Sequence, residues 1–124
     1  MPTPRRLPDP EALLADAPLV WAALSTAGWS AAALDELLGA TARSHLDRDE
    51  LAPVLRRTEG GTPLEVLARL FVVGVAVDLK QARAAGVPET WLVPDGYGVA
   101  AAVRLQPVVH DGVEVLVAHD PGRA

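Results

Sequence analysis

The stretch TPLEVLARLFVVG, residues 62–74, carries the chemistry of both ends of a helix around a strongly apolar run. Thr62 suits the N-cap and Pro63 the first helical position, where no backbone donor is needed. Glu65 stands three residues after the cap and can reach back to close a capping box. Gly74 can end the helix in a left-handed conformation. The sequence therefore predicts a helix over 62–74.

Apolar side chains spread around most of this predicted helix. They are Leu64, Val66, Leu67, Leu70, Phe71, Val72 and Val73. Glu65 and Arg69 remain as a single i,i+4 polar stripe. A helix with so little polar surface must be surrounded by other elements. We therefore expect the core of the protein to form around residues 62–74.

Length and composition predict a single folded domain. The chain has 124 residues, of which 50% are hydrophobic, and it contains no cysteine. That length suits one core, and that hydrophobic content argues against disorder throughout. The absence of cysteine excludes disulfides, thiolate metal sites and thiol nucleophiles. No apolar run reaches the ~18 to 20 residues of a membrane span, and no apolar signal region follows the start, so we expect a cytoplasmic protein.

Prolines and glycines divide the first third of the chain into short helices. A turn or two of helix is expected over 9–15, after a proline-rich arm, and after a break Pro18 is expected to restart the helix. A second helix is expected over 19–27, with Trp21 and Trp29 packed into its seam.

Two further helices are expected between residues 31 and 58. Ser30 can cap a helix over 31–38, which the following glycine ends. Asp47 and Glu50 have the spacing of a capping box for a further helix. Pro53 either kinks that helix or delays its start.

The second half changes from helix to strand. A glycine pair at 60–61 predicts a hinge before the central helix, and Asp78 can cap a short helix over 79–85. Strands are then expected at Trp91–Val93, Val99–Gln106 and Val113–His119, with hairpin turns at Asp95-Gly96 and Asp111-Gly112. The predicted fold is α+β and mainly helical, with N-terminal helices followed by a winged-helix-like unit that ends in a β-hairpin. We expect an arm with a short helix at 1–17, one domain at 18–119, and a tail or linker at 120–124.

No catalytic, cofactor-binding or metal-binding set is predicted in this chain. His45, His110 and His119 are scattered, whereas zinc sites need three or four ligands at defined geometry. The glycine cluster over 95–98 is followed by a strand, whereas a phosphate-binding loop opens a helix, so a hairpin turn is the better interpretation.

Partner binding is the remaining role. The net charge of −5 argues against a general affinity for nucleic acid, which needs concentrated cations. Arg56 with Arg57, and Lys80 with Arg83, are the two candidate basic patches, and solvated surface is the simpler interpretation of each. The candidate partner-binding residues are Arg56, Arg57, Lys80, Arg83 and Trp91.

Three runs resemble a known family. They are GWSAAALDELLG (28–39), LAPVLRRTEGGTPLEVLARLFVVGVAV (51–77) and VRLQPVVHDGVEVLVAHD (103–120). Together they resemble the N-terminal domain of actinobacterial class I methyltransferases related to release-factor glutamine methyltransferases. The resemblance covers residues 19–120, and its middle run is the most specific part.

The resemblance implies a domain that precedes a Rossmann-type domain, which would bind S-adenosylmethionine. This chain has neither the glycine loop of such a domain nor its Asn-Pro-Pro-aromatic motif, so no catalytic residue is carried over. It also differs from the family in the helix before the wing, which is shorter here. The leading hypothesis is a bacterial substrate-docking domain of a methyltransferase, whose partner is a protein substrate or its own catalytic domain. A winged-helix nucleic-acid-binding module and a stand-alone interaction or dimerisation domain stay open as alternatives. The oligomeric state stays open as well, and no membrane partner is expected.

Overall fold

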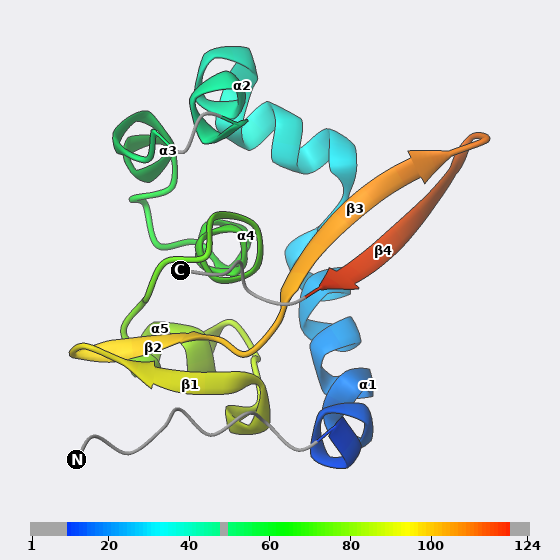
Figure 1. The fold of residues 1–124 in the computed structure, drawn as a ribbon, viewed down its shortest axis with the longest axis vertical. Helices are drawn as coiled ribbons and strands as arrows, with labels where there is room; N and C mark the ends of the chain where they lie inside the picture. Colours follow the sequence, from blue (N-terminus) through cyan, green and yellow to red (C-terminus); the bar gives the residue numbers. More distant parts are fainter. Residues whose placement is uncertain (1–9, 48–49, 120–124) are drawn as a thin grey trace.

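The computed structural model describes residues 10–47 and 50–119, and it is α+β and mainly helical, as predicted (Figure 1). The helical elements are α1 (Pro10–Ala27), α2 (Ala31–Asp47), α3 (Ala52–Arg57), α4 (Pro63–Ala68), the π-helical η1 (Arg69–Val73), α5 (Leu79–Ala84) and the 3-10 turn η2 (Glu89–Trp91). The strands are β1 (Leu92–Asp95), β2 (Gly98–Ala101), β3 (Arg104–His110) and β4 (Val113–His119). The predicted arm over 1–9 and the tail at 120–124 lie outside the described residues.

The predicted capping box opens the central helix. The Thr62 side chain accepts a hydrogen bond from the Glu65 N–H at 3.3 Å, and the Glu65 carboxylate accepts one from the Thr62 N–H at 3.1 Å. Pro63 occupies the first turn. The predicted start of this helix is therefore confirmed.

The second half of the central helix is wider than an α-helix. From Arg69 onward it is a π-helix, in which the Gly74 N–H donates to the Arg69 carbonyl at 2.9 Å. Gly74 ends it at φ 80°, as the sequence predicted. The four residues of the sequence LFVV, 70–73, are all buried, so the wide turn faces neighbours on every side.

Other elements surround α4 and η1, as their apolar sequence requires. Phe71 is fully buried between Trp29 and Trp91, and each indole lies edge-on at a ring-centroid distance of 6.3 Å. The main core also includes Val20, Leu24, Val66, Leu67, Leu70, Val77, Ala82, Val87, Ala101 and Leu105. On other sides of the same helix, Val72 packs with Leu34 in a smaller cluster. The central helix thus joins the N-terminal helices to the hairpins.

The break predicted before Pro18 is wrong. Helix α1 runs without a break through Pro18. Proline removes one hydrogen bond to the carbonyl of residue 14, but Leu14 is 74% exposed, so water can reach that side of the helix. Trp29 is half-buried against Phe71 as expected, whereas Trp21 is 58% exposed and does not pack into the seam.

The boundaries of the next two helices follow the sequence in part. The Ser30 hydroxyl accepts from the Ala33 N–H at 2.9 Å, which confirms the cap, and Gly39 breaks the helix at φ 74° before it resumes. The capping box predicted for Asp47 and Glu50 is wrong, because α2 extends through Asp47 and the N-cap of α3 is Leu51. Of the two effects predicted for Pro53, a kink or a delayed start, the structure shows the delayed start, because α3 begins at Ala52.

The strands form two separate hairpins instead of one continuous unit (Figure 1). The strand predicted over 99–106 is divided, because Ala101 and Ala102 are both buried and the alternation of the two faces fails there. The Ala102 N–H donates to the Trp91 carbonyl at 2.8 Å, outside either ladder. Strand β1 pairs with β2 and β3 with β4, both antiparallel. The turn predicted at Asp111-Gly112 is confirmed, with positive φ at both residues.

Within the described ranges, no single helix is long and apolar enough to cross a membrane. Helix α1 and the first part of α2, Ala31–Gly39, meet that length and composition only as a pair bent by 56°.

The capping box makes stability depend on pH. Glu65 accepts hydrogen bonds from the Thr62 hydroxyl at 2.6 Å and from the Thr62 and Gly60 N–H groups, and these bonds, the hydroxyl first, hold the pKa of Glu65 below its usual 4.5. A lowered folded-state pKa stabilises the fold above pH 4.5, and that contribution is lost as pH falls through the folded-state pKa. Glu65→Gln should therefore cost about 1 kcal/mol at pH 7 and progressively less in acid.

Urea unfolding at several pH values between 7 and 3 measures how far the free energies of unfolding of the wild type and Glu65→Gln approach each other in acid. Thr62→Ala removes the principal donor to the carboxylate and should flatten the pH dependence in the same way. A difference between wild type and Glu65→Gln that stays constant across the range would contradict the role given to Glu65.

Candidate functional site

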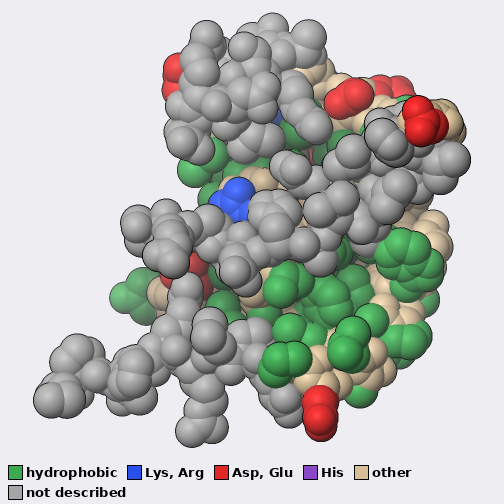
Figure 2. Space-filling view, turned by 45° about the vertical axis from the view of Figure 1, so that its right-hand side comes forward, with side chains coloured by type: hydrophobic (Ala, Val, Ile, Leu, Met, Phe, Trp, Pro, Cys, Tyr) green, Lys and Arg blue, Asp and Glu red, His purple; other side chains and the backbone are tan. Residues whose placement is uncertain are grey.

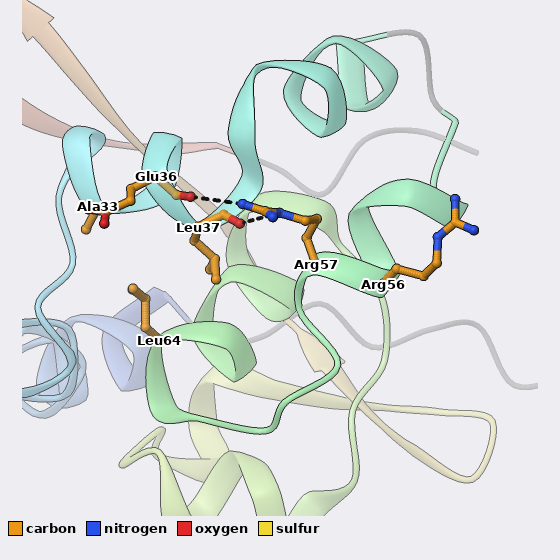
Figure 3. Close-up of a pocket in the computed structure, with 6 residues that line it drawn as sticks. All are labelled: Ala33, Glu36, Leu37, Arg56, Arg57 and Leu64. Atoms are coloured by element: carbon orange, nitrogen blue, oxygen red, sulfur yellow. Dashed lines mark hydrogen bonds between the residues drawn. The ribbon is translucent and has the colours of Figure 1, made fainter.

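An open groove of about 570 Å³ lies between α2, α3 and α4. Its lining residues are Ala33, Glu36, Leu37, Arg56, Arg57 and Leu64 (Figure 3). Leu37 from α2 and Leu64 from α4 face one another across it and give it an apolar floor (Figure 3). The predicted candidates Arg56 and Arg57 thus come together with three apolar residues that the sequence did not single out as site residues.

Arg57 forms hydrogen bonds to the backbone of α2 at the edge of the groove. Its Nε donates to the Leu37 carbonyl at 2.9 Å, and its terminal nitrogen donates to the Glu36 carbonyl at 3.2 Å. These carbonyls lie in the turn of α2 just before Gly39 breaks the helix, so they lack partners within it. The Arg57 guanidinium therefore caps the C-terminal end of the first part of α2.

Arg56 is the free member of the pair. Its side chain is exposed and points away from α2 (Figure 3). Among the residues that the structure describes, it has no hydrogen bond or ion pair. Arg56 can therefore meet a partner at the flank of the groove without losing an interaction inside the domain.

The two arginines should respond differently to substitution. Arg57→Ala removes two charge-assisted hydrogen bonds to helix carbonyls and should destabilise the domain by about 1 kcal/mol, since the site is open to water. Arg56→Ala, one residue away on the same helix, is the matched control and should change stability by less than about 0.5 kcal/mol. Denaturant midpoints of both variants test this difference, and equal midpoints would contradict the assignment of Arg57 as a cap.

Lys80 and Arg83 lie on α5, apart from the groove. Helix α4 lies between α3 and α5 (Figure 1). Arg83 is paired with Glu89, to which its Nε donates at 2.9 Å, and both side chains are about 60% exposed. Lys80 is exposed, and its backbone N–H donates to the capping Asp78 carboxylate at 2.8 Å. The two predicted basic pairs therefore do not form one surface.

Trp91, predicted as a partner-binding residue, lies in the core. It is 8% exposed, its ring packs edge-on against Phe71, and its indole N–H donates to the Leu13 carbonyl of α1 at 3.0 Å. The sequence predicted that Trp91 begins a strand, but it belongs to η2, which packs against α1.

Within residues 10–47 and 50–119, no three histidine or acidic side chains gather where a metal ion would fit. The side chains of His45, His110 and His119 lie outside the described part. The glycine cluster over 95–98 forms the turn of the β1–β2 hairpin, as predicted. The groove has an apolar floor, with the exposed Arg56 beside it.

One family model matches the chain over residues 26–118, and it describes a domain of unknown function, DUF7059. The chain belongs to this family. The match begins at the end of α1 and runs to the last strand, so the DUF7059 segment contains the whole groove between α2, α3 and α4. No curated protein and no solved structure matches the chain.

Proposed function

We propose that this DUF7059 domain is a docking module of an S-adenosylmethionine-dependent methyltransferase in the bacterial cytoplasm, and that it binds a protein substrate for a catalytic domain in the same polypeptide. The observation that carries the proposal is the groove, in which Leu37 and Leu64 offer apolar contact and Arg56 an exposed positive charge. Such a surface suits a protein segment with an apolar side chain and a neighbouring carboxylate. The methyltransferase context comes from the family resemblance of residues 19–120.

The placement of the cations favours a protein over a nucleic acid. Arg57 donates a hydrogen bond to a carbonyl of α2, and Arg83 is paired with Glu89. Arg104 is half-buried and donates to the Val72 carbonyl at 3.4 Å. Lys80 and Arg56 are exposed on separate helices, and the net charge of the chain is −5. In the part of the chain that the structure describes, this places fewer cations on one surface than are needed to neutralise several phosphates of a duplex.

The reading frame beyond residue 124 is the first test. A docking module should be followed by a strand, a glycine-rich cofactor loop and an Asn-Pro-Pro-aromatic motif. In that longer polypeptide, Leu64→Glu should raise KM for the methyl acceptor about tenfold, which corresponds to about 1.4 kcal/mol, and leave the Kd of S-adenosylmethionine unchanged. Tyr97→Glu, on the exposed β1–β2 turn, is the control. A stop codon after residue 124 would favour the stand-alone interaction module.

The 124-residue chain alone should bind no S-adenosylmethionine, because a glycine loop that opens a helix is needed to hold such a cofactor. Isothermal titration calorimetry measures this directly. Saturable micromolar binding would overturn the non-catalytic role and return attention to the turn at 95–98.

The nucleic-acid alternative has its own test. Fluorescence anisotropy with labelled duplex DNA and structured RNA, at two salt concentrations, should detect no binding tighter than about 10⁻⁶ M. Sub-micromolar binding that weakens steeply with salt and is lost in Arg56→Ala would instead favour a nucleic-acid-binding module.

A further inference from the structure

Helix α1 exposes an apolar face. Leu14 is 74% exposed, Trp21 58% and Leu19 55%, and Pro18 lies exposed among them. Leu14, Pro18 and Trp21 follow one another at i, i+4 and i+7, which places them on one side of the helix. Figure 2 shows hydrophobic side chains gathered on this side of the molecule. We call Leu14, Ala15, Pro18, Leu19, Trp21 and Ala22 the α1 face.

The opposite side of α1 fixes the helix to the domain. Val20 and Leu24 are buried in the main core, and the Leu13 carbonyl accepts the Trp91 indole N–H. The Asp16 carboxylate accepts from the Thr90 hydroxyl at 2.5 Å. Because these contacts hold α1 in place, the helix cannot rotate to bury its outer face. A helix that is apolar on both sides calls for a partner on the outer one.

We propose that the α1 face binds the α1 face of a second copy of this protein, as an antiparallel helix pair around a two-fold axis at Pro18. About such an axis, Leu14 of each copy lies opposite Ala22 of the other, and Trp21 lies opposite Ala15. Each large side chain therefore meets a small one, which is the fit that close helix packing requires.

The charge distribution on α1 favours a second copy of the protein as the partner of the α1 face. Helix α1 contains no lysine or arginine, so its outer face offers nothing to an acidic peptide or a phosphate. A second copy presents the same uncharged face. In the antiparallel arrangement Glu11 of each copy lies at the end of the pair, opposite Ser25 of the other, so the two carboxylates are kept apart and the helix dipoles oppose one another.

The size of the face predicts a weak dimer. The 18 residues of α1 extend about 27 Å, and a helix with its side chains is about 12 Å wide, so the flat contact is roughly 300 Å² on each copy. Interlocking side chains bury more than this flat area, yet the total stays at the low end of specific interfaces. Dimerisation with a Kd in the tens of micromolar is the expectation.

Sedimentation velocity of the 124-residue protein between about 1 and 500 μM tests the proposal. The weight-average mass should rise from monomer toward dimer, and the Trp21 emission should shift to shorter wavelength over the same range. Trp21→Asp should keep the protein monomeric without changing its far-ultraviolet circular dichroism, since Trp21 makes no core contact. Tyr97→Asp, which replaces a more exposed aromatic on the β1–β2 turn, should dimerise like the wild type.

A size exchange tests the antiparallel register. Ala22→Leu should place two leucines opposite each other and weaken the dimer, and the added Leu14→Ala should restore it. A wild type that stays monomeric at 500 μM, or a dimer that Trp21→Asp leaves intact, would overturn the proposal. So would a Trp21 blue shift that appears only with phosphatidylcholine vesicles, which would assign the face to a lipid surface. The measurements involve no cofactor or methyl acceptor, and the DUF7059 match begins at residue 26, so their failure would leave the proposed function untouched.

Discussion

Phe71→Ala is expected to lower the free energy of unfolding by about 3 to 5 kcal/mol, the range found when a large aromatic is removed from a packed interior. Phe71 is fully buried, and both Trp29 and Trp91 rest edge-on against its ring. Its removal leaves a cavity between two indoles, of which that of Trp91 is held by the hydrogen bond from its N–H to the Leu13 carbonyl. The Trp91 indole therefore cannot readily collapse into the space, which favours the upper part of the range.

Chemical denaturation monitored by tryptophan fluorescence measures the effect. Leu67→Ala, also fully buried in the same core, should cost about 2 to 5 kcal/mol. Tyr97→Ala removes an exposed aromatic from a turn and is the control, with an expected change below about 0.5 kcal/mol. An unchanged midpoint in both core variants would show that the helix over 62–74 is not the centre of the fold.

Three helix caps and one helix end were the most predictable parts of this fold. The caps at Ser30, Thr62 and Asp78 are local, because each side chain bonds a backbone N–H two or three residues further on. The glycine at 74 ends its helix for an equally local reason, its left-handed conformation. Such signals are legible in a sequence because no distant residue is needed to complete them.

Tertiary packing decided the features that the sequence left undetermined. A break was expected before Pro18, but contacts on both sides of this residue, from Leu13 to Leu24, hold the helix to the core. Arg69 was expected to form only a polar stripe with Glu65. In the structure its guanidinium also reaches α3, where it donates to the Leu55 carbonyl at 2.8 Å and to the Thr58 hydroxyl at 3.0 Å. No spacing rule reports a bond across 14 residues of sequence.

The candidate site was predictable only in part, for the same reason. Charge alone marked Arg56 and Arg57 as equivalent, and only the fold shows that the Arg57 guanidinium is used by the α2 carbonyls. The apolar floor had a weak signal, since Ala33 and Leu37 are four residues apart on one helix. Leu64, from α4, joins them only once the helices pack.

A second large effect is expected at Gly98, the first residue of β2. A Cβ atom there would lie within 3.0 Å of the Val77 carbonyl carbon and closer still to its oxygen. Val77 and Val99 exchange two backbone hydrogen bonds at this point, of 2.8 and 2.9 Å, and Val77 is buried. Gly98→Ala must therefore push the segment after η1 away from the hairpin, since backbone cannot yield as a flexible side chain does. We expect a loss of about 1 to 3 kcal/mol.

The neighbouring Gly96 separates this steric cause from a general sensitivity of the hairpin. Gly96 has φ 60° and no atom within 4 Å of an added Cβ, so it needs a left-handed conformation but has room for a side chain. Asparagine tolerates that conformation, and Gly96→Asn should change stability little. Amide hydrogen exchange provides the decisive readout, because Gly98→Ala should selectively expose the Val77 and Val99 amides, whereas Gly96→Asn should leave both protected. If Gly98→Ala kept both amides protected, the close approach between β2 and residue 77 would not constrain the fold, and the hairpin would have to be held to the central helix by its side chains alone.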